Sequence, residues 1–193
     1  MKTTFTLIAM CFTMMIHAQW IQNTSCNKDA ALIANQAIEY TLNLEYMAAF
    51  GVANAALLLD KDCGCAKLTL AYISSSNPKW GSRAKKLAAI NTASLTPEEK
   101  GWHTYMMAST EDTKGLETSF LSEFPKSPLL NFLSTSMQDF NTFKAFAEKF
   151  PNNAAPAYNL ISYGYISGAY GEKNSEKARL FLLFYIKKNS ILG

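Results

Sequence analysis

The sequence predicts an all-α fold, an α-solenoid of about five stacked antiparallel helical hairpins. Two features of the chain indicate this fold. Glycine and proline are scarce, with 9 and 6 residues among 193, whereas residues that favour helices, such as Ala and Leu, are frequent. Small and aromatic residues also recur at helical spacing, and the pattern returns after about 34 residues. Hairpins of this kind bury their apolar faces by stacking on one another.

The first hairpin is expected between residues 30 and 63. Ala37 and Tyr40 lie three positions apart on one face of its first helix, and a break follows at Asn43. Its second helix carries a stripe at spacings of three, four and three, formed by Tyr46, Ala49, Ala53 and Ala56. Alanines on such a stripe let two helices approach closely, and the tyrosines fill the space beside them.

The second hairpin is expected one period later, where Ala71 and Trp80 repeat the alanine and tyrosine positions of the first. Residues 74–78 are predicted to form its turn, because Pro78 disfavours helix at the residue before it. The third hairpin begins over residues 94–99, where Thr96 is a good N-cap and Pro97 follows at the first helical position. Its helices carry Trp102, Tyr105, Met106 and Ser109, then Leu116, Phe120, Leu121 and Phe124.

A shortened fourth hairpin is predicted over residues 127–150, and a fifth follows it. The pair Phe124-Pro125 recurs as Phe150-Pro151, so that each time an aromatic residue closes one helix before a proline. The fourth hairpin carries Leu130, Leu133, Met137, Phe143, Ala147 and Phe150. The fifth carries Tyr158, Ile161, Ser162 and Tyr165, then a turn at 168–175, then Ala178, Leu182 and Tyr185.

Residues 1–18 are predicted to be a signal peptide, and residues 19–193 the helical repeat domain. Lys2 gives a positive start, and an apolar run from Phe5 to Ile16 follows. This run is shorter than the roughly 20 residues that a membrane-spanning helix needs, and the small Ala18 suits cleavage before Gln19. A buried N-terminal helix is the alternative. We therefore expect an exported protein, periplasmic or extracellular, with no membrane span after signal removal.

Three cysteines remain after such cleavage: Cys26, Cys63 and Cys65. In an oxidising compartment an odd number indicates one disulfide with a free thiol, or an intermolecular bridge, with unpaired thiols as the alternative. Cys63 and Cys65 lack the two-residue spacer of a thioredoxin motif, and three thiols fall short of the four ligands of a structural zinc. The sequence predicts no metal site.

The sequence carries no recognisable catalytic motif. After cleavage, His103 is the single histidine, on an amphipathic helix where we expect it to be packed or half-exposed. Adjacent carboxylates at Glu98-Glu99 are expected to complement the helix dipole or face solvent, since neighbouring helical residues point to different faces. The basic residues are dispersed, which argues against nucleic-acid binding. We expect a protein that is not an enzyme and has no cofactor.

The pattern resembles the tetratricopeptide repeat (TPR), and more narrowly exported bacterial repeat proteins of this type, over roughly residues 28–190. The first unit matches at Ala37, Tyr40, Tyr46, Ala49 and Ala56, and the last at Tyr158, Ile161, Tyr165, Ala178 and Leu182. Lys61 and Ser190 depart from it, because they stand where the repeat closes with proline. The middle units are degenerate.

The resemblance implies a scaffold or binding protein whose first helices line a concave groove for a protein or peptide partner of unknown identity. Asn159 and Tyr163 are the binding residues that it singles out. The alternative is a helical domain that binds a small molecule or glycan in an aromatic cleft. An antiparallel first hairpin would also bring Cys26 beside Cys63 and Cys65, where a disulfide could form. The last helix is expected to leave an apolar face open, with Phe181, Leu182, Phe184, Tyr185 and Ile186.

Overall fold

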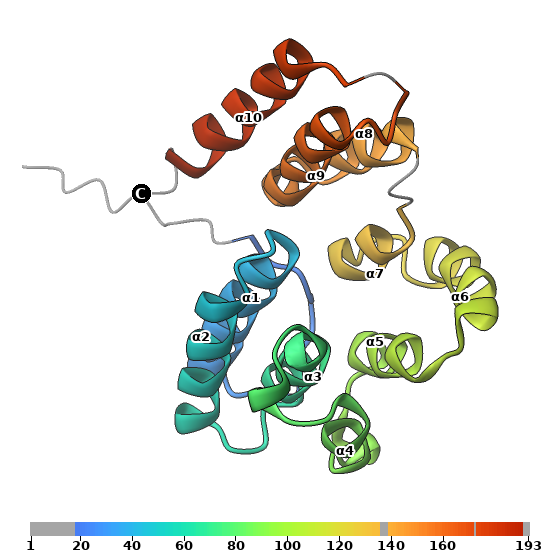
Figure 1. The fold of residues 1–193 in the computed structure, drawn as a ribbon. Coiled ribbons are helices and arrows are strands. Elements are labelled where there is room, and N and C mark those ends of the chain that lie inside the picture. The colour runs from blue at the N-terminus through green and yellow to red at the C-terminus, as the bar shows by residue number, and fades with distance from the viewer. Residues whose placement is uncertain (1–17, 136–138, 172, 191–193) are drawn as a thin grey trace, which may run out of the picture.

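The computed structural model describes residues 18–135, 139–171 and 173–190. Within these ranges all regular structure is helical and no strand occurs, which confirms the all-α prediction. The α-helices (Figure 1) are α1 (Lys28–Leu42), α2 (Tyr46–Leu59), α3 (Gly64–Ile73), α4 (Arg83–Ala88), α5 (Pro97–Met107), α6 (Thr110–Glu123), α7 (Pro128–Leu133), α8 (Phe140–Lys149), α9 (Ala155–Ser167) and α10 (Ser175–Ser190). The 3-10 turns are η1 (Ser74–Ser76), η2 (Pro78–Trp80), η3 (Thr92–Ser94) and η4 (Pro151–Asn153).

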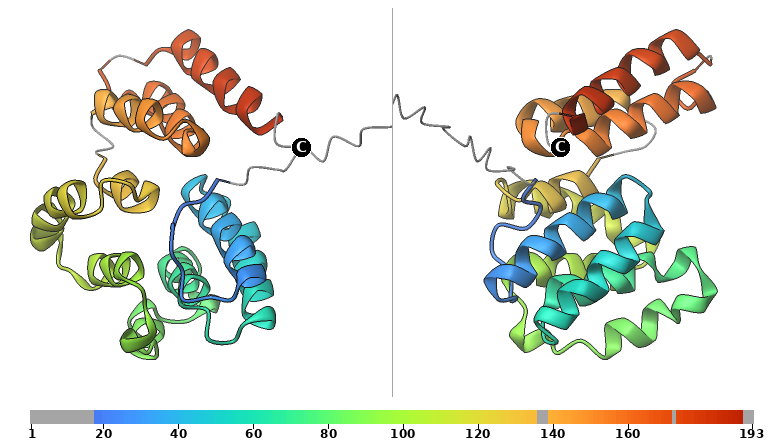
Figure 2. Two further views of the ribbon diagram at one scale, coloured as in Figure 1. Left: turned by 180° about the vertical axis from the view of Figure 1, so that it is seen from behind. Right: turned by 90° about the vertical axis from the view of Figure 1, so that its left-hand side faces the viewer.

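Consecutive helices pack against one another along a curved row (Figure 1; Figure 2). The closest pairs are α1 with α2 and α9 with α10, and α3 packs on both helices of the first hairpin. The row bends so far that its two ends meet, where Nδ2 of Asn159 in α9 donates to the backbone oxygen of Asn43 at 3.3 Å. This order of packing is compatible with the predicted stack of hairpins.

The first hairpin has the predicted helices, because its pattern is local. The predicted break at Asn43 is confirmed, since α1 ends at Leu42 and α2 begins at Tyr46. The alanines that form the close contact of α1, α2 and α3 are all fully buried: Ala30, Ala34, Ala37, Ala49, Ala53, Ala56 and Ala71. At the third hairpin, the predicted start of α5 is also confirmed, as the Thr96 hydroxyl accepts the N–H of Glu99 in a capping box.

The second hairpin departs from the prediction in its second helix. The chain continues through two 3-10 turns, and Gly81 then takes a left-handed φ of 88°, so that α4 begins only at Arg83. Trp80 therefore lies in η2 rather than in that helix, and its ring stacks on Phe50 of α2 at 4.8 Å. Ser109, expected on α5, is instead the N-cap of α6. Residues 1–17 of the predicted signal peptide, and Met137, lie outside the described residues.

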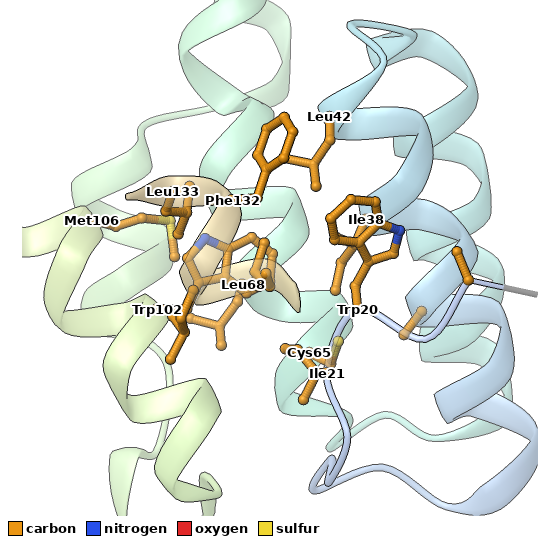
Figure 3. Packing of buried hydrophobic residues seen from close by; sticks show 14 of the residues in the cluster. Trp20, Ile21, Ile38, Leu42, Cys65, Leu68, Trp102, Met106, Phe132 and Leu133 are labelled. Atoms are coloured by element: carbon orange, nitrogen blue, oxygen red, sulfur yellow. The ribbon is translucent and has the colours of Figure 1, made fainter. Parts of the chain in front are cut away.

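Residues 18–27, the N-terminal arm, form an irregular segment without helix or strand, which packs against the helices and buries Ala18, Trp20 and Ile21. Trp20 and Ile21 are 0% exposed. The Trp20 ring is stacked on Phe146 of α8 at 6.1 Å and meets the edge of Phe132 of α7 at 5.7 Å. Figure 3 shows Trp20 beside Ile38 of α1. The arm thus joins the first hairpin to the fourth within one hydrophobic core.

Buried polar side chains hold the backbone of the arm. Oδ1 of Asn35 in α1 accepts the N–H groups of Trp20 and Ile21, at 2.7 and 2.9 Å. In α5, Oε2 of Glu98 accepts the N–H groups of the next two arm residues at 2.9 and 3.1 Å, and Glu99 accepts that of Ser25 at 3.1 Å. Both residues lie in the first turn of α5, as expected for side chains that complement the helix dipole, whereas the alternative that they face solvent is wrong. They are 8% and 0% exposed, because the arm needs acceptors inside the protein.

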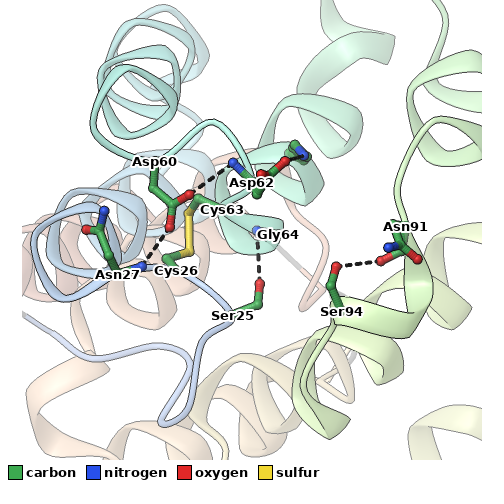
Figure 4. A network of polar contacts seen from close by, with 10 residues as sticks. Ser25, Cys26, Asn27, Asp60, Asp62, Cys63, Gly64, Asn91 and Ser94 are labelled. Carbon is green, nitrogen blue, oxygen red and sulfur yellow. Dashed lines mark hydrogen bonds and ion pairs between the residues drawn. A yellow bond between two sulfur atoms is a disulfide. The ribbon is translucent and has the colours of Figure 1, made fainter.

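A disulfide joins the C-terminal end of the arm to the α2–α3 loop (Figure 4). Cys26 is bonded to Cys63, 37 residues away, and closing such a loop contributes about 4 kcal/mol on the chain-entropy estimate. Beside it, the N–H of Gly64 donates to the Ser25 hydroxyl at 3.0 Å (Figure 4). A Cβ at position 64 would collide with the side chain of Leu95 and with this hydroxyl, so that both side chains would have to shift. Cys65 keeps a free, buried thiol, whose pKa burial raises well above its usual value.

Asn35→Ala tests the anchoring of the arm. It removes the acceptor of two buried N–H groups, and because each unsatisfied group costs about 1–3 kcal/mol, we expect a loss of about 3 kcal/mol in the free energy of unfolding. Urea denaturation measures this. Asn54→Ala is the matched control, because Asn54 bonds only to the carbonyl one turn before it, as Asn35 also does. Equal losses in the two variants would contradict the anchoring role.

A second test uses pH. Burial raises the pKa of Glu39 from 4.5 to about 7, the Trp20 side chain offsets part of this rise, and Glu45 adds to it. A carboxyl with a raised pKa takes up a proton on folding, so that its contribution to stability is complete below pH 4.5 and is lost as pH rises through about 7. Relative to Glu39→Gln, the wild type should therefore melt at progressively lower temperature across this range. A difference in melting temperature that does not change with pH would refute the assignment.

Candidate functional site

The main candidate site is a cleft of about 360 Å³ on the inner side of the row, here called the tyrosine cleft. All odd-numbered helices, α1, α3, α5, α7 and α9, contribute to its wall. The start of α2, the α1–α2 turn, α8 and Thr135, which follows α7, complete it. Its lining residues are Thr41, Leu42, Leu44, Tyr46, Tyr72, Tyr105, Phe132, Leu133, Thr135, Phe143, Leu160 and Tyr163. The site is thus built from segments of every hairpin.

The cleft is aromatic and uncharged. None of its lining residues carries a formal charge, whereas four are tyrosines. Burial raises the pKa of Tyr72 to about 12. The pKa of Tyr105 is also raised, mainly by burial and secondly by the nearby charge of Glu117. These phenols therefore stay protonated at neutral pH and can donate as well as accept hydrogen bonds. In the part of the chain that the structure describes, no hydrogen bond from the four tyrosine hydroxyls is found, so that they remain open to a ligand.

Two residues at the rim expose apolar surface. Tyr163 is 56% exposed and Leu44 is 50% exposed. Leu44 also has a φ of 66°, in the left-handed region that residues with a Cβ rarely adopt. This conformation costs about 1 kcal/mol or more, and such strain gathers at functional sites. The α1–α2 turn therefore has a leucine at the rim of the cleft, although asparagine or glycine would adopt this backbone conformation more easily.

The two binding residues predicted by the resemblance have different surroundings. Tyr163 lines the cleft. Asn159 does not line it, because its amide bonds to the α1–α2 turn and so fixes α9 against one wall. Sequence reasoning missed Tyr72 as a site residue and assigned Tyr105 only to a helix face. No local signal marks them, because the cleft depends on how far the row of hairpins bends.

Other chemistry-bearing residues lie elsewhere. His103 is half-buried, with Nε2 at 3.4 Å from the backbone oxygen of Leu87, and does not line the cleft. Among the described residues there is no group of three His, Cys, Asp or Glu side chains that could hold a metal ion.

No helix within the same ranges is long and apolar enough to cross a membrane. On α10, Phe181 packs on Tyr165, whereas the exposed apolar residues are Leu180, Leu182, Leu183, Phe184 and Ile186.

Leu44→Asn tests whether the rim leucine stabilises the fold. Asparagine tolerates the left-handed conformation, so that the relief of about 1 kcal/mol of strain offsets the apolar burial that a half-exposed leucine contributes. We expect the free energy of unfolding to change by less than about 0.5 kcal/mol. Leu42→Asn, at the buried end of α1, is the control and should cost about 3 kcal/mol or more. A comparable loss of stability in both variants would make Leu44 a packing residue.

None of the family models, curated proteins or solved structures compared with this chain matches it. The resemblance to tetratricopeptide repeats therefore stays a prediction.

Proposed function

We propose that this protein is an exported binding module that holds an uncharged, extended segment of a partner protein in the tyrosine cleft. The observation that carries the proposal is the convergence of four tyrosines, with no charged residue, in one cleft lined by every hairpin. Tyrosine rings supply a large contact area at low conformational cost, and their hydroxyls pair with the backbone amides of a peptide. A charged segment would lose its hydration in such a cleft without gaining a partner.

The resemblance noted above supports the same proposal. In tetratricopeptide proteins the first helix of each hairpin lines the concave groove. Here the first helices of all five predicted hairpins contribute to the cleft: α1, α3, α5, α7 and α9. Tyr163, which the resemblance singled out, lies on the last of them.

The proposed location outside the cytoplasm rests on two observations. Residues 1–18 have the composition of a signal peptide. The bond between Cys26 and Cys63 supports an oxidising compartment, because disulfides of this structural kind persist there and are rare in the cytosol.

A small molecule or glycan is the second candidate for the ligand. Its support is the size of the cleft, about 360 Å³, which lies in the range of small-molecule pockets. Flat rings with unpaired hydroxyls would also suit the faces and hydroxyl groups of a sugar. The two ligand classes differ in whether main-chain amides are needed for binding.

Tyr163→Ala tests the proposal. Residues 19–193, with the disulfide intact, are used to select peptides from a random library, and affinities are measured by fluorescence polarisation. Because exposed aromatic residues dominate such interfaces, Tyr163→Ala should weaken binding about tenfold or more. Ile166→Ala is the matched control, since Ile166 lies on the same helix, is equally 56% exposed and does not line the cleft. It should change affinity less than about twofold.

Two results would count against peptide binding. Peptides that bind both variants equally would place their site outside the cleft. A glycan or small molecule that binds in a Tyr163-dependent manner, when no peptide does, would favour the second candidate.

A further inference from the structure

A second cavity, the arm pocket, lies where the N-terminal arm meets the start of α5 and the α6–α7 loop. It has a volume of about 430 Å³ and shares no lining residue with the tyrosine cleft. The arm contributes Gln22 and Asn23, and the start of α5 contributes Thr96, Pro97 and Glu98. The end of α6 contributes Glu123, and the α6–α7 loop contributes Phe124, Pro125, Lys126 and Ser127. The proposed function uses none of these residues.

Glu98 is the unusual member of this lining, because its carboxylate is only half satisfied. The residue is only 8% exposed, and its Oε2 accepts the N–H groups of Gln22 and Asn23. Its Oε1 is buried, and within the described part of the chain it has no hydrogen-bond partner. A buried carboxylate oxygen without a donor is unfavourable, so that a donor that gains access to it from the pocket would be stabilised by it.

The charge around the pocket indicates a single positive charge on that donor. Glu98 is inside, whereas Glu123 and Lys126 are exposed residues of the same lining. Counted by formal charge, two acidic side chains and one basic one give the lining one net negative charge. One monovalent cation would neutralise it.

The geometry of the donor set selects among cations. Only one oxygen of Glu98 is free, so that a guanidinium cannot form its usual bidentate pair, whereas an ammonium, a point charge, suits a single oxygen. A divalent metal would lack ligands, because no cluster of three donors occurs in the described ranges. Phe124, Pro97 and Pro125 give the pocket apolar walls that suit an alkyl chain.

We propose that the arm pocket binds a primary alkylammonium group, with Glu98 as its charge partner and the ring of Phe124 against its alkyl chain. This chemistry occurs in the lysine side chain of a protein and in a free alkylamine. Glu98 then has two roles: one oxygen holds the arm, and the other binds the ligand.

The test is an NMR titration of residues 19–193, with the disulfide intact, using Nα-acetyl-lysine-N-methylamide as the probe. The amide signals of Gln22 and Asn23 should shift in a saturable manner, because both residues line the pocket. The isosteric norleucine derivative, which lacks the ammonium, is the control and should bind at least about tenfold more weakly. No saturable shift with the lysine derivative, or equal affinity for the two compounds, overturns the proposal.

Glu98→Gln separates the two roles of the side chain. The amide oxygen can still accept the arm N–H groups, but an NH₂ group replaces Oε1 and repels an ammonium. The dissociation constant should rise about tenfold while the arm signals keep their positions in the free protein. Unchanged affinity in this variant overturns the assignment of Glu98.

Glu123→Gln is a second test of the charge argument, which can be used if Glu98→Gln detaches the arm from α5. This exposed residue holds no part of the arm, and its substitution should raise the dissociation constant about threefold, in a salt-dependent manner. No effect of this variant at low salt would contradict the charge argument. A titration with n-butylamine distinguishes a free alkylamine from a lysine side chain as the natural ligand. An affinity equal to that of the lysine derivative supports a free alkylamine. Weaker binding supports a lysine side chain, whose main chain adds contacts.

Discussion

The structure depends on the partial burial of an irregular segment, the N-terminal arm, against a stack of helices. Such a segment has no helical hydrogen bonds for its N–H groups, and no sheet is available among the described residues to supply acceptors. Side-chain acceptors replace that sheet here: Asn35 on α1, and Glu98 and Glu99 on α5. These side chains belong to different hairpins, so that the arm fixes the first hairpin relative to the third. The disulfide at Cys26 then limits how far the arm can leave.

The arm also connects the two cavities. On one side the arm forms a wall of the arm pocket. Glu98 lines this pocket and also accepts an N–H group of the arm. On the other side Trp20 supports the ring of Phe132, which lines the tyrosine cleft. The arm therefore lines one cavity and supports a wall of the other. A ligand that binds the arm pocket only while the arm is docked would stabilise the docked state by mass action.

The sequence predicted what depends on local pattern. The alanine stripe of the first hairpin, the break at Asn43 and the helix start at Thr96 are encoded within a few residues, and the structure has all three. The roles of Glu98 and Glu99 were missed because their partners lie more than 70 positions away in the chain. Trp80 was misplaced because Gly81 interrupts the helix that periodicity alone suggested. The resemblance pointed to Tyr163, whereas the contribution of Tyr72 depends on the curvature of the row, which no single hairpin encodes.

Native-state hydrogen exchange of the arm amides is the most direct test of this account. The N–H groups of Trp20, Ile21 and Ser25 are predicted to exchange as slowly as those in the middle of α1, because each is bonded to a buried side-chain acceptor. Exchange of these three amides at the rate of an unstructured peptide, while α1 stays protected, would show that the arm is not part of the fold. The arm pocket would then lose the wall that Gln22 and Asn23 form.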